Sequence, residues 1–300
     1  MRYRLSLCLA GLFALAVAAR AEEPCRLVAK ASLNMDMDQS GEVAVPVVID
    51  GTNFEMLVDT GSYESILTEA TVKALGHRIM KSNGGYLVGF GGRIIDGTAE
   101  VKNFRIGNAR ASNITFMVIP DGYLDPKLGG LLGADILYFF DLDFDFANAK
   151  LNLISPDHCE GKEVYWTNDA HAQIPFKLED ARHIRIKVQI DGKDVRAMVD
   201  TGASMSVMSL ETAENLFGFD EATAKKDNYL YPFKTLTLQG VVVNNPRIRL
   251  VPDDKSKVMG GFAGMSREPD MILGMSVLRQ LHLYIAYHEG KIYATPASAH

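Results

Sequence analysis

The sequence lacks the excess of basic residues that is typical of nucleic-acid-binding proteins. Against 31 Lys and Arg stand 37 Asp and Glu, which gives a formal net charge of −6 over 300 residues, so we expect no nucleic acid among its partners. Its histidines show no paired metal spacing, and the glycines at 89–92 lack the full dinucleotide fingerprint. We therefore expect no metal and no cofactor. The run Asp141, Asp143, Asp145 indicates one face of a strand, with calcium as the weaker alternative.

Long apolar runs are also scarce, and the one that exists lies at the N-terminus. Arg2 and Arg4 precede LSLCLAGLFALAVAA, and Ala19-Arg20-Ala21 has the small-x-small pattern of a cleavage site. We predict a signal peptide over residues 1–21, with an uncleaved membrane anchor as the alternative. The mature chain, from residue 22, is then expected in the periplasm or outside the cell, with no membrane contact after cleavage.

Cysteine is rare, with three in the whole chain. Cys8 lies in the predicted signal peptide, which leaves Cys25 and Cys159. Two cysteines in an oxidising compartment can pair, and this bond would tie the mature N-terminus to the middle of the chain. Two separate thiols are the alternative. Neither cysteine lies in a recognisable nucleophile motif with histidine.

An internal repeat is the most informative feature that the sequence does contain. The first half has VAVPVVIDGTNFEMLVDTGSYESIL, and the second has IRIKVQIDGKDVRAMVDTGASMSVM. Each copy predicts a strand, an Asp-Gly hairpin turn and a second strand that ends at Asp-Thr-Gly. A helical pattern follows each copy, TEATVKALG in the first half and SLETAENLFG in the second. The repeat therefore predicts two similar halves.

The later parts of the two halves match as well. A pair of strands is predicted over 101–121 and again over 233–253, and LLGADI corresponds to ILGMSV. The distance from Asp59 to Gly133 is 74 positions, as is the distance from Asp200 to Gly274. Unrelated halves would not keep three kinds of motif in the same order at this spacing.

The two Asp-Thr-Gly motifs, each followed by hydrophobic-hydrophobic-Gly, resemble the pepsin and retropepsin superfamily of aspartic peptidases. The resemblance covers nearly the whole mature chain and implies an all-β, bilobal pepsin-like fold of two similar β-barrel-like lobes with short helices. We expect an N-terminal lobe over 22–158, a linker over 159–173 and a C-terminal lobe over 174–300. The fused arrangement implies a monomer, and the alternative is a homodimer in which each half pairs with its copy in the other chain.

The resemblance also assigns roles to the motif residues. It implies that Asp59 and Asp200 form a catalytic pair that shares one proton and activates water to hydrolyse a polypeptide substrate. The residues that position the pair are expected to be Thr60, Gly61, Thr201, Gly202 and Ser204. The rival interpretation is a catalytically inactive peptide-binding protein of the same fold.

The first half has nine more residues than the second between its helix and its late strands. The extra stretch, within NGGYLVGFGGRIIDGTAEV, is glycine-rich between apolar segments and predicts a hairpin. Under the resemblance this hairpin is a single flap that closes over the substrate, and an ordinary surface hairpin is the alternative. Its substrate-binding residues are expected to be Tyr86, Gly89, Phe90 and Gly91.

One residue departs from the family pattern. Two positions after the motif glycine the family usually has Ser or Thr, able to bond the outer oxygen of the aspartate. The second half has Ser204 there, and the first half has Tyr63. Ser62 and Ser65 are the candidates to replace that bond in the first half.

Overall fold

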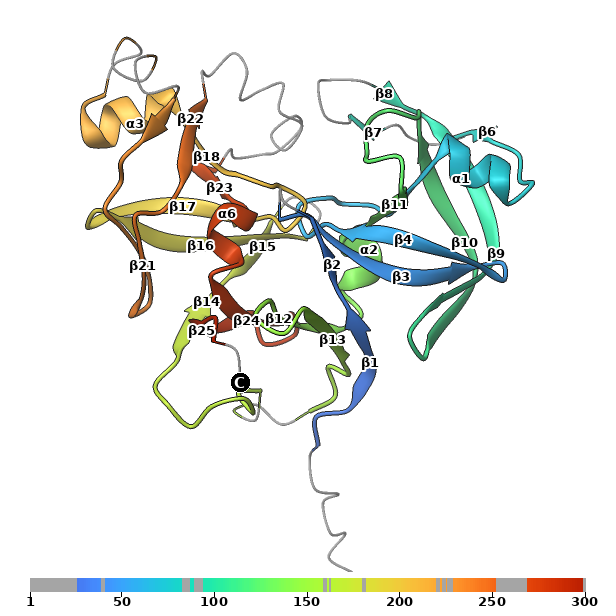
Figure 1. The fold of residues 1–300 in the computed structure, drawn as a ribbon, viewed down its shortest axis with the longest axis horizontal. Helices are drawn as coiled ribbons and strands as arrows, with labels where there is room; N and C mark the ends of the chain where they lie inside the picture. Colours follow the sequence, from blue (N-terminus) through green and yellow to red (C-terminus); the bar gives the residue numbers. More distant parts are fainter. Residues whose placement is uncertain are drawn as a thin grey trace, which may run out of the picture.

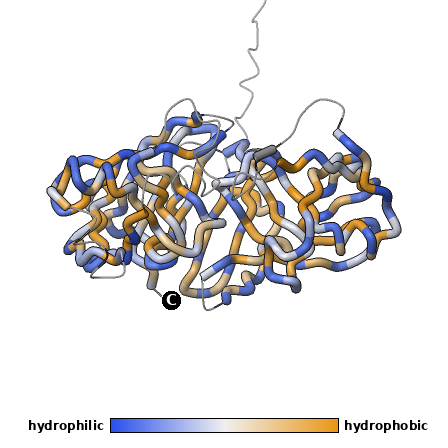
Figure 2. Tube along the Cα trace, turned by 90° about the horizontal axis from the view of Figure 1, so that it is seen from above, coloured by the Kyte–Doolittle hydropathy of each residue, from blue (hydrophilic) through white to orange (hydrophobic). Residues whose placement is uncertain are grey.

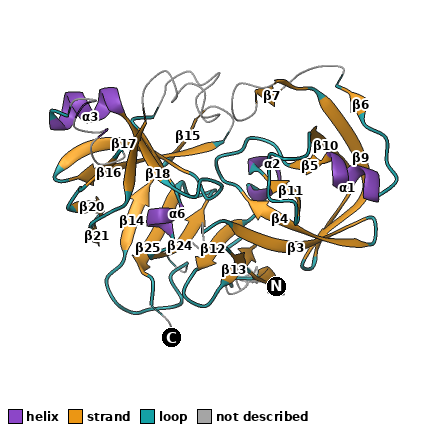
Figure 3. Ribbon diagram, turned by 45° about the horizontal axis from the view of Figure 1, so that its top comes forward, coloured by secondary structure: helices purple, strands orange, loops and turns teal. Residues whose placement is uncertain are grey.

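The computed structural model describes residues 26–298, except 39–40, 83–86, 89–93, 159–160, 162, 180–181, 220–221, 223–224, 226–228 and 252–268. Strands dominate this part of the chain, and the helices are short (Figure 3). Two lobes, one from each half of the sequence, stand side by side over a sheet to which both contribute (Figure 1). The predicted all-β bilobal fold is confirmed. Within the described residues, no helix is both long and apolar enough to cross a membrane.

The N-terminal lobe is an eight-stranded sheet that closes on itself, because β3 pairs with both β4 and β9. A separate two-stranded hairpin is formed by β7 (Leu87–Val88) and β8 (Ile94–Ile95). The order of the closed sheet is β2 (Asp36–Met37), β3 (Val43–Ile49), β4 (Thr52–Val58), β11 (Leu128–Leu132), β5 (Ile66–Thr68), β10 (Ala109–Ile119), β9 (Gly97–Ile106) and β6 (Met80–Lys81).

The C-terminal lobe repeats the central strands of this arrangement, and its described strands do not close on themselves in the same way. In each lobe the strand that ends at Asp-Thr-Gly pairs in parallel with a short late strand, β4 with β11 and β17 with β23. The strands run in the order β19 (Leu230–Tyr231), β22 (Ile248–Val251), β18 (Ser206–Ser209), β23 (Met271–Leu273), β17 (Lys193–Val199), β16 (His183–Ile190), β20 (Thr235–Leu238) and β21 (Val241–Asn244), and β15 (Lys177–Glu179) pairs with β16.

Local sequence signals account for the turns and helices of the repeat. The predicted hairpin turns are confirmed: Asp50 and Gly51 have φ of 46° and 86°, and Asp191 and Gly192 have φ of 46° and 78°, the left-handed pair that a two-residue hairpin requires. The predicted helices are α1 (Glu69–Ala74) and α3 (Leu210–Phe217). A hydroxyl side chain caps each N-terminus, since Thr68 accepts from Thr71 N–H and Ser209 from Thr212 N–H.

Alternating hydropathy builds the core of both lobes. Hydrophobic and hydrophilic stretches alternate along much of the chain in Figure 2, as expected where strands turn one face toward a core. In β16 the residues Ile184, Ile186, Val188 and Ile190 are all buried. Two short helices, α2 (Ala134–Leu137) and α6 (Met275–Leu278), follow the late strands at equivalent places in the two lobes.

A six-stranded sheet joins the two halves. The contact between halves is antiparallel, between β12 and β24, with Asp143 opposite Tyr284. The order is β1 (Ala29–Asn34), β13 (Lys150–Ile154), β12 (Asp141–Asp145), β24 (Leu281–Ala286), β25 (Lys291–Pro296) and β14 (Ala172–Pro175). This shared sheet fixes the lobes relative to one another, so that the Asp-Thr-Gly turn of each half meets the other.

The segment predicted as a linker packs onto the shared sheet where it is described. The Trp166 ring stacks on His282 with centroids 4.1 Å apart, and its Nε1–H donates to Thr295 at 3.0 Å. The hydroxyl of Tyr165 donates to Asp143. These contacts attach the connection between the halves to strands of both.

Candidate active site

Each Asp-Thr-Gly turn begins where a buried strand ends. Asp59 follows β4 and Asp200 follows β17, and the last residues of both strands are buried apolar side chains. The Asp59 N–H donates to Leu132 O at 2.9 Å, and the Asp200 N–H donates to Leu273 O at 3.1 Å. The parallel partner strand therefore holds each aspartate backbone at the edge of the core, where both side chains are partly exposed.

Four hydrogen bonds between the threonines and the opposite turn join the two lobes. Thr60 Oγ1 donates to Val199 O at 3.0 Å and accepts from Thr201 N–H at 3.1 Å. Thr201 Oγ1 donates to Val58 O at 2.7 Å and accepts from Thr60 N–H at 3.1 Å. Both threonines are fully buried. Each hydroxyl thus satisfies one donor and one acceptor of the other half, and the two turns are fixed face to face.

The two aspartate side chains lie over each other's turns. A Cβ atom placed on Gly61 would be 2.3 Å from Asp200 Cγ, and one placed on Gly202 would be 2.3 Å from Asp59 Cγ. The two carboxyl groups are close enough that each affects the pKa of the other. Only glycine fits at positions 61 and 202, because the Cβ of any other residue would occupy the space of the opposite carboxyl.

Backbone N–H groups hold one oxygen of each carboxyl in equivalent ways. Asp59 Oδ1 accepts from Gly61 N–H and Ser62 N–H, both at 2.9 Å. Asp200 Oδ1 accepts from Gly202 N–H at 2.9 Å and Ala203 N–H at 3.1 Å. These bonds leave the other oxygens of the pair for each other and for a ligand.

Burial raises the pKa of both carboxyls. For Asp59 the loss of hydration raises the pKa well above its usual range, and the charge of Asp200 adds to the effect. For Asp200 burial also raises the pKa, while the bonds from Gly202 N–H and the Asp59 carboxyl oppose that rise. Both shifts favour the protonated form, and two adjacent carboxyls cannot both ionise easily.

A polar brace supports each turn from below. The N–H of Gly133 donates to Ser65 Oγ at 2.9 Å, and that of Gly274 donates to Ser206 Oγ at 3.0 Å. The partner of the serine differs between halves: Ser65 Oγ donates to Asp135 at 2.6 Å, whereas Ser206 Oγ lies 3.2 Å from the hydroxyl of Ser276. The serine partners in these braces were not predicted, although the repeat aligns Ser65 with Ser206.

The structure does not confirm the expected replacements for the family hydroxyl that Tyr63 lacks. The side chain of Tyr63 is largely exposed, at 42%. Ser62 Oγ donates to Glu64 O and Ser65 Oγ to Asp135, so neither hydroxyl replaces the family bond to the aspartate. Within the described chain, the hydroxyl of Ser204 makes no hydrogen bond to Asp200 either. In neither half, therefore, does a hydroxyl from this region bond the aspartate as in the family pattern.

Several predicted residues lie outside the described residues. These are the signal peptide, Cys25, Cys159 and the flap residues Tyr86, Gly89, Phe90 and Gly91. The hairpin predicted there is present in its flanking strands, because Leu87 pairs with Ile95 and Val88 with Ile94. The disulfide and the individual flap residues stay predictions.

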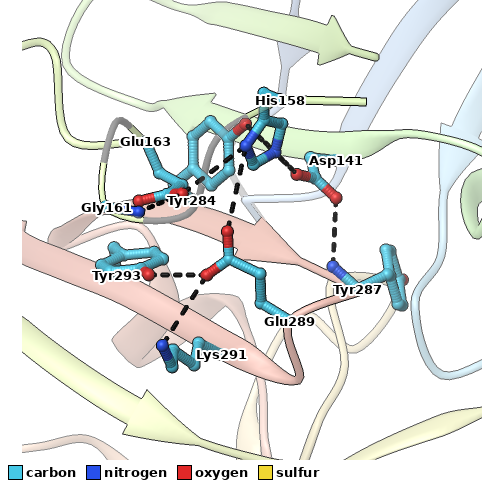
Figure 4. Close-up of polar contacts among 9 residues, drawn as sticks. All are labelled: Asp141, His158, Gly161, Glu163, Tyr284, Tyr287, Glu289, Lys291 and Tyr293. Carbon is cyan, nitrogen blue, oxygen red and sulfur yellow. Dashed lines mark hydrogen bonds and ion pairs between the residues drawn. The ribbon is translucent and has the colours of Figure 1, made fainter. Parts of the chain in front are cut away.

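One group of described residues has the composition of a metal site. The ligand atoms of His158, Glu163 and Glu289 all lie within 4.8 Å of one another (Figure 4). The imidazole of His158 lies between Asp141, at 2.5 Å from Nε2, and Glu163, at 3.5 Å from Nδ1. Burial, together with the adjacent Glu163 carboxyl, raises the pKa of Glu289 to about 7. A proton on Glu289 can therefore reduce the negative charge of this group without a metal ion. The group lies at the shared sheet and its connections, not at either Asp-Thr-Gly turn.

Comparison with known proteins identifies the family. The model of the family described as aspartyl protease matches twice, over residues 45–136 and 186–277. The two matches are displaced by the same 141 positions that separate Thr60 from Thr201. They cover more than half of the chain and include both Asp-Thr-Gly turns, so this protein belongs to the aspartyl protease family. No curated protein matches the sequence.

Among solved structures, the basic 7S globulin from soybean has a similar fold. The TM-score is 0.55 at 10% sequence identity, and the similarity covers 92% of this chain and 96% of that one. At so low an identity the likeness establishes the bilobal pepsin-like fold alone.

We expect the threonine contacts to be the main polar support of the paired turns. Replacing Thr60 or Thr201 with Val keeps the shape but leaves one buried N–H and one buried C=O of the opposite turn without a partner. Each unsatisfied group costs about 1–3 kcal/mol, so each variant, with two such groups, should lose about 2–6 kcal/mol of unfolding free energy in urea melts. Ser at either position restores the hydroxyl and should lose less than half as much, whereas equal losses for Val and Ser would contradict the proposed contacts.

Proposed function

We propose that this protein is an aspartic endopeptidase in which Asp59 and Asp200 are the catalytic residues. The observation that supports it best is the arrangement of two carboxyls from opposite halves, each lying over the opposite motif glycine, partly exposed, and held by two backbone N–H groups. A pair that shares one proton contains a base and an acid at the same place. The single chain supplies both carboxyls, which favours a monomer over a homodimer.

The proposed hydrolysis is a two-step exchange of protons. In the first step the ionised carboxylate takes a proton from a water molecule as its oxygen attacks the peptide carbonyl carbon, and the protonated carboxyl gives its proton to the carbonyl oxygen. In the second step the newly protonated carboxyl donates to the amide nitrogen, the C–N bond breaks, and the other carboxyl takes back a proton from the tetrahedral intermediate. The products are a carboxylic acid and an amine, and the pair again holds one proton.

The substrate class and location follow from the sequence expectations. The chemistry suits an internal peptide bond of a polypeptide bound in extended form, with the β7–β8 hairpin as the proposed flap. The basic and apolar N-terminal segment supports export to the periplasm or beyond the cell. The rival proposal, a peptide-binding protein without catalysis, predicts binding of an unfolded polypeptide without cleavage.

We expect activity to depend on pH as it would for two paired carboxyls whose pKa values are raised. Because burial raises both pKa values, the state with one proton persists above the ordinary aspartate pKa of about 3.9. The rate should therefore fall as rising pH removes the shared proton, and fall again in strong acid as the second carboxyl is protonated. Cleavage of a reduced, unfolded protein between pH 2 and 9, followed by mass spectrometry of the fragments, measures this profile.

The same experiment tests the proposed function against its rival. We expect internal cleavage with a bell-shaped profile for the purified protein. Cleavage that persists unchanged up to pH 9, or binding of the substrate with no cleavage at any pH, would refute the proposal. Light scattering under the same conditions reports whether the active species is the expected monomer.

A further inference from the structure

A histidine of the C-terminal half reaches the Asp-Thr-Gly turn of the N-terminal half. His183, the first residue of β16, is 7% exposed, and its Nε2 lies 3.0 Å from the carbonyl oxygen of Gly61. A carbonyl oxygen can only accept, so Nε2 must carry the proton of this bond. The contact is therefore a hydrogen bond from one lobe to the turn that carries Asp59.

The bond is made to the peptide group that also holds Asp59. The Gly61 carbonyl and the Ser62 N–H belong to one planar peptide unit, whose two ends point in opposite directions. Ser62 N–H donates to Asp59 Oδ1 at 2.9 Å. The donor on the carbonyl side therefore sets the direction of the N–H on the other side, and it polarises the unit in the sense that strengthens that N–H as a donor.

The second turn has no histidine donor at the aligned position, which lies in the first half of the chain. The repeat aligns Asp200 with Asp59 and His183 with Glu42. An ionised carboxylate has no proton to donate to a carbonyl oxygen. The corresponding bond in the second turn, from Ala203 N–H to Asp200 Oδ1, is 3.1 Å long. The two halves thus differ at the position that controls this peptide unit.

We propose that His183 is a positioning residue for Asp59, which acts through the Gly61–Ser62 peptide to direct the Ser62 N–H at Oδ1. Its kinetic consequence rests on the proposed peptidase function, whereas its geometric consequence does not. With the donor removed, the peptide unit loses this restraint, and we expect Asp59 Oδ1 to keep the bond from Gly61 N–H but to lose the bond from Ser62 N–H. The second turn keeps its own contacts.

Two substitutions at His183 distinguish the effect of its hydrogen bond from the effect of its side-chain volume. His183→Leu removes the hydrogen-bond donor and fills part of the buried space with an apolar side chain. His183→Gln keeps one, because the amide Nε2 of glutamine is three bonds from Cβ, as is the imidazole Nε2. We expect kcat to fall about tenfold in the Leu variant, which corresponds to about 1.4 kcal/mol, the size of one hydrogen bond. KM should change less than about twofold, and the Gln variant should retain kcat within about threefold of the original protein.

Arg182→Met is the matched control. Arg182 makes a neighbouring contact between lobes, since its Nη1 donates to Ala134 O at 3.4 Å and its guanidinium carbon lies 4.8 Å from the Tyr138 ring centre. Loss of this contact should lower the melting temperature while kcat stays within about twofold. If His183→Leu behaves like this control, or if Gln restores nothing, His183 has only a structural part and the proposal is wrong.

A crystal structure of the His183→Leu variant tests the proposal without an activity assay. We expect the distance from Ser62 N to Asp59 Oδ1 to exceed 3.5 Å in the variant, with Ala203 N still bonded to Asp200. An unchanged bond of 2.9 Å overturns the proposal. A protein that cleaves no polypeptide, but whose variant shows the rotated peptide, would refute the proposed function and leave the positioning role intact.

Discussion

Replacing either Asp59 or Asp200 with asparagine should reduce kcat by about 10³–10⁴-fold. Positioned acid–base groups typically contribute 10²–10⁴-fold, and residues that act as one unit lose most of their effect when either is removed. Asparagine keeps the size and the acceptor oxygen for the backbone donors at 61 and 202, but it can neither take a proton from water nor return one. The measurement is kcat for cleavage of a peptide with one scissile bond, at the pH optimum of the original protein.

These variants should remain folded. Because burial raises the pKa of the paired carboxyls, the pair stabilises the native state below the unfolded pKa, and that contribution is lost as pH rises through the folded pKa. At neutral pH the Asn variants should therefore be at least as stable as the original protein in urea melts. Asp270→Asn, which removes a carboxylate bonded to Arg196, is the control and should leave kcat within twofold. Full activity of Asp59→Asn would exclude the catalytic assignment.

The second large effect is expected from one added methyl group at Gly61 or Gly202. The new Cβ would lie 2.3 Å from the Cγ of the opposite aspartate, well inside van der Waals contact. Either the turn or the carboxyl must move, and both movements separate the pair. Because a displacement of about 1 Å at a reacting group can cost 10²-fold, Gly61→Ala and Gly202→Ala should each lower kcat at least about 10²-fold, with about 1–3 kcal/mol of lost stability.

Gly240→Ala separates the effect at the pair from the general cost of replacing a glycine. Gly240 has a φ of +99° in the β20–β21 turn, and an added Cβ would meet nothing within 4 Å. Its substitution strains the backbone and should lower stability while kcat stays within about twofold. If Gly61→Ala retained normal kcat, the carboxyls could not lie over the turns as described.

Much of each lobe could be predicted because its determinants are local. The Asp-Gly pairs specify left-handed turn residues, the alternation in β16 specifies a buried face, and Thr68 and Ser209 mark helix starts. The repetition of these signals at constant spacing predicted two similar lobes. It also predicted the two aspartates, since each follows a buried strand in the same way.

The contacts between the halves could not be predicted from local patterns. The pairing of β12 with β24 joins segments about 140 positions apart, and nothing in either strand specifies its partner. The polar segment before β14 has no periodicity, yet Trp166 packs on His282 through a ring contact that depends on the tertiary fold. His183 lies just before the stretch in which the repeat is evident, so its approach to Gly61 appears only once the lobes are placed together.

Neutron diffraction from crystals grown at mildly acidic pH would observe the decisive proton directly. We predict that a single deuteron occupies the hydrogen bond between the carboxyls of residues 59 and 200, within one chain. The mechanism would be contradicted if the two carboxyl groups were too far apart to hydrogen-bond, or if neither carried a deuteron at that pH.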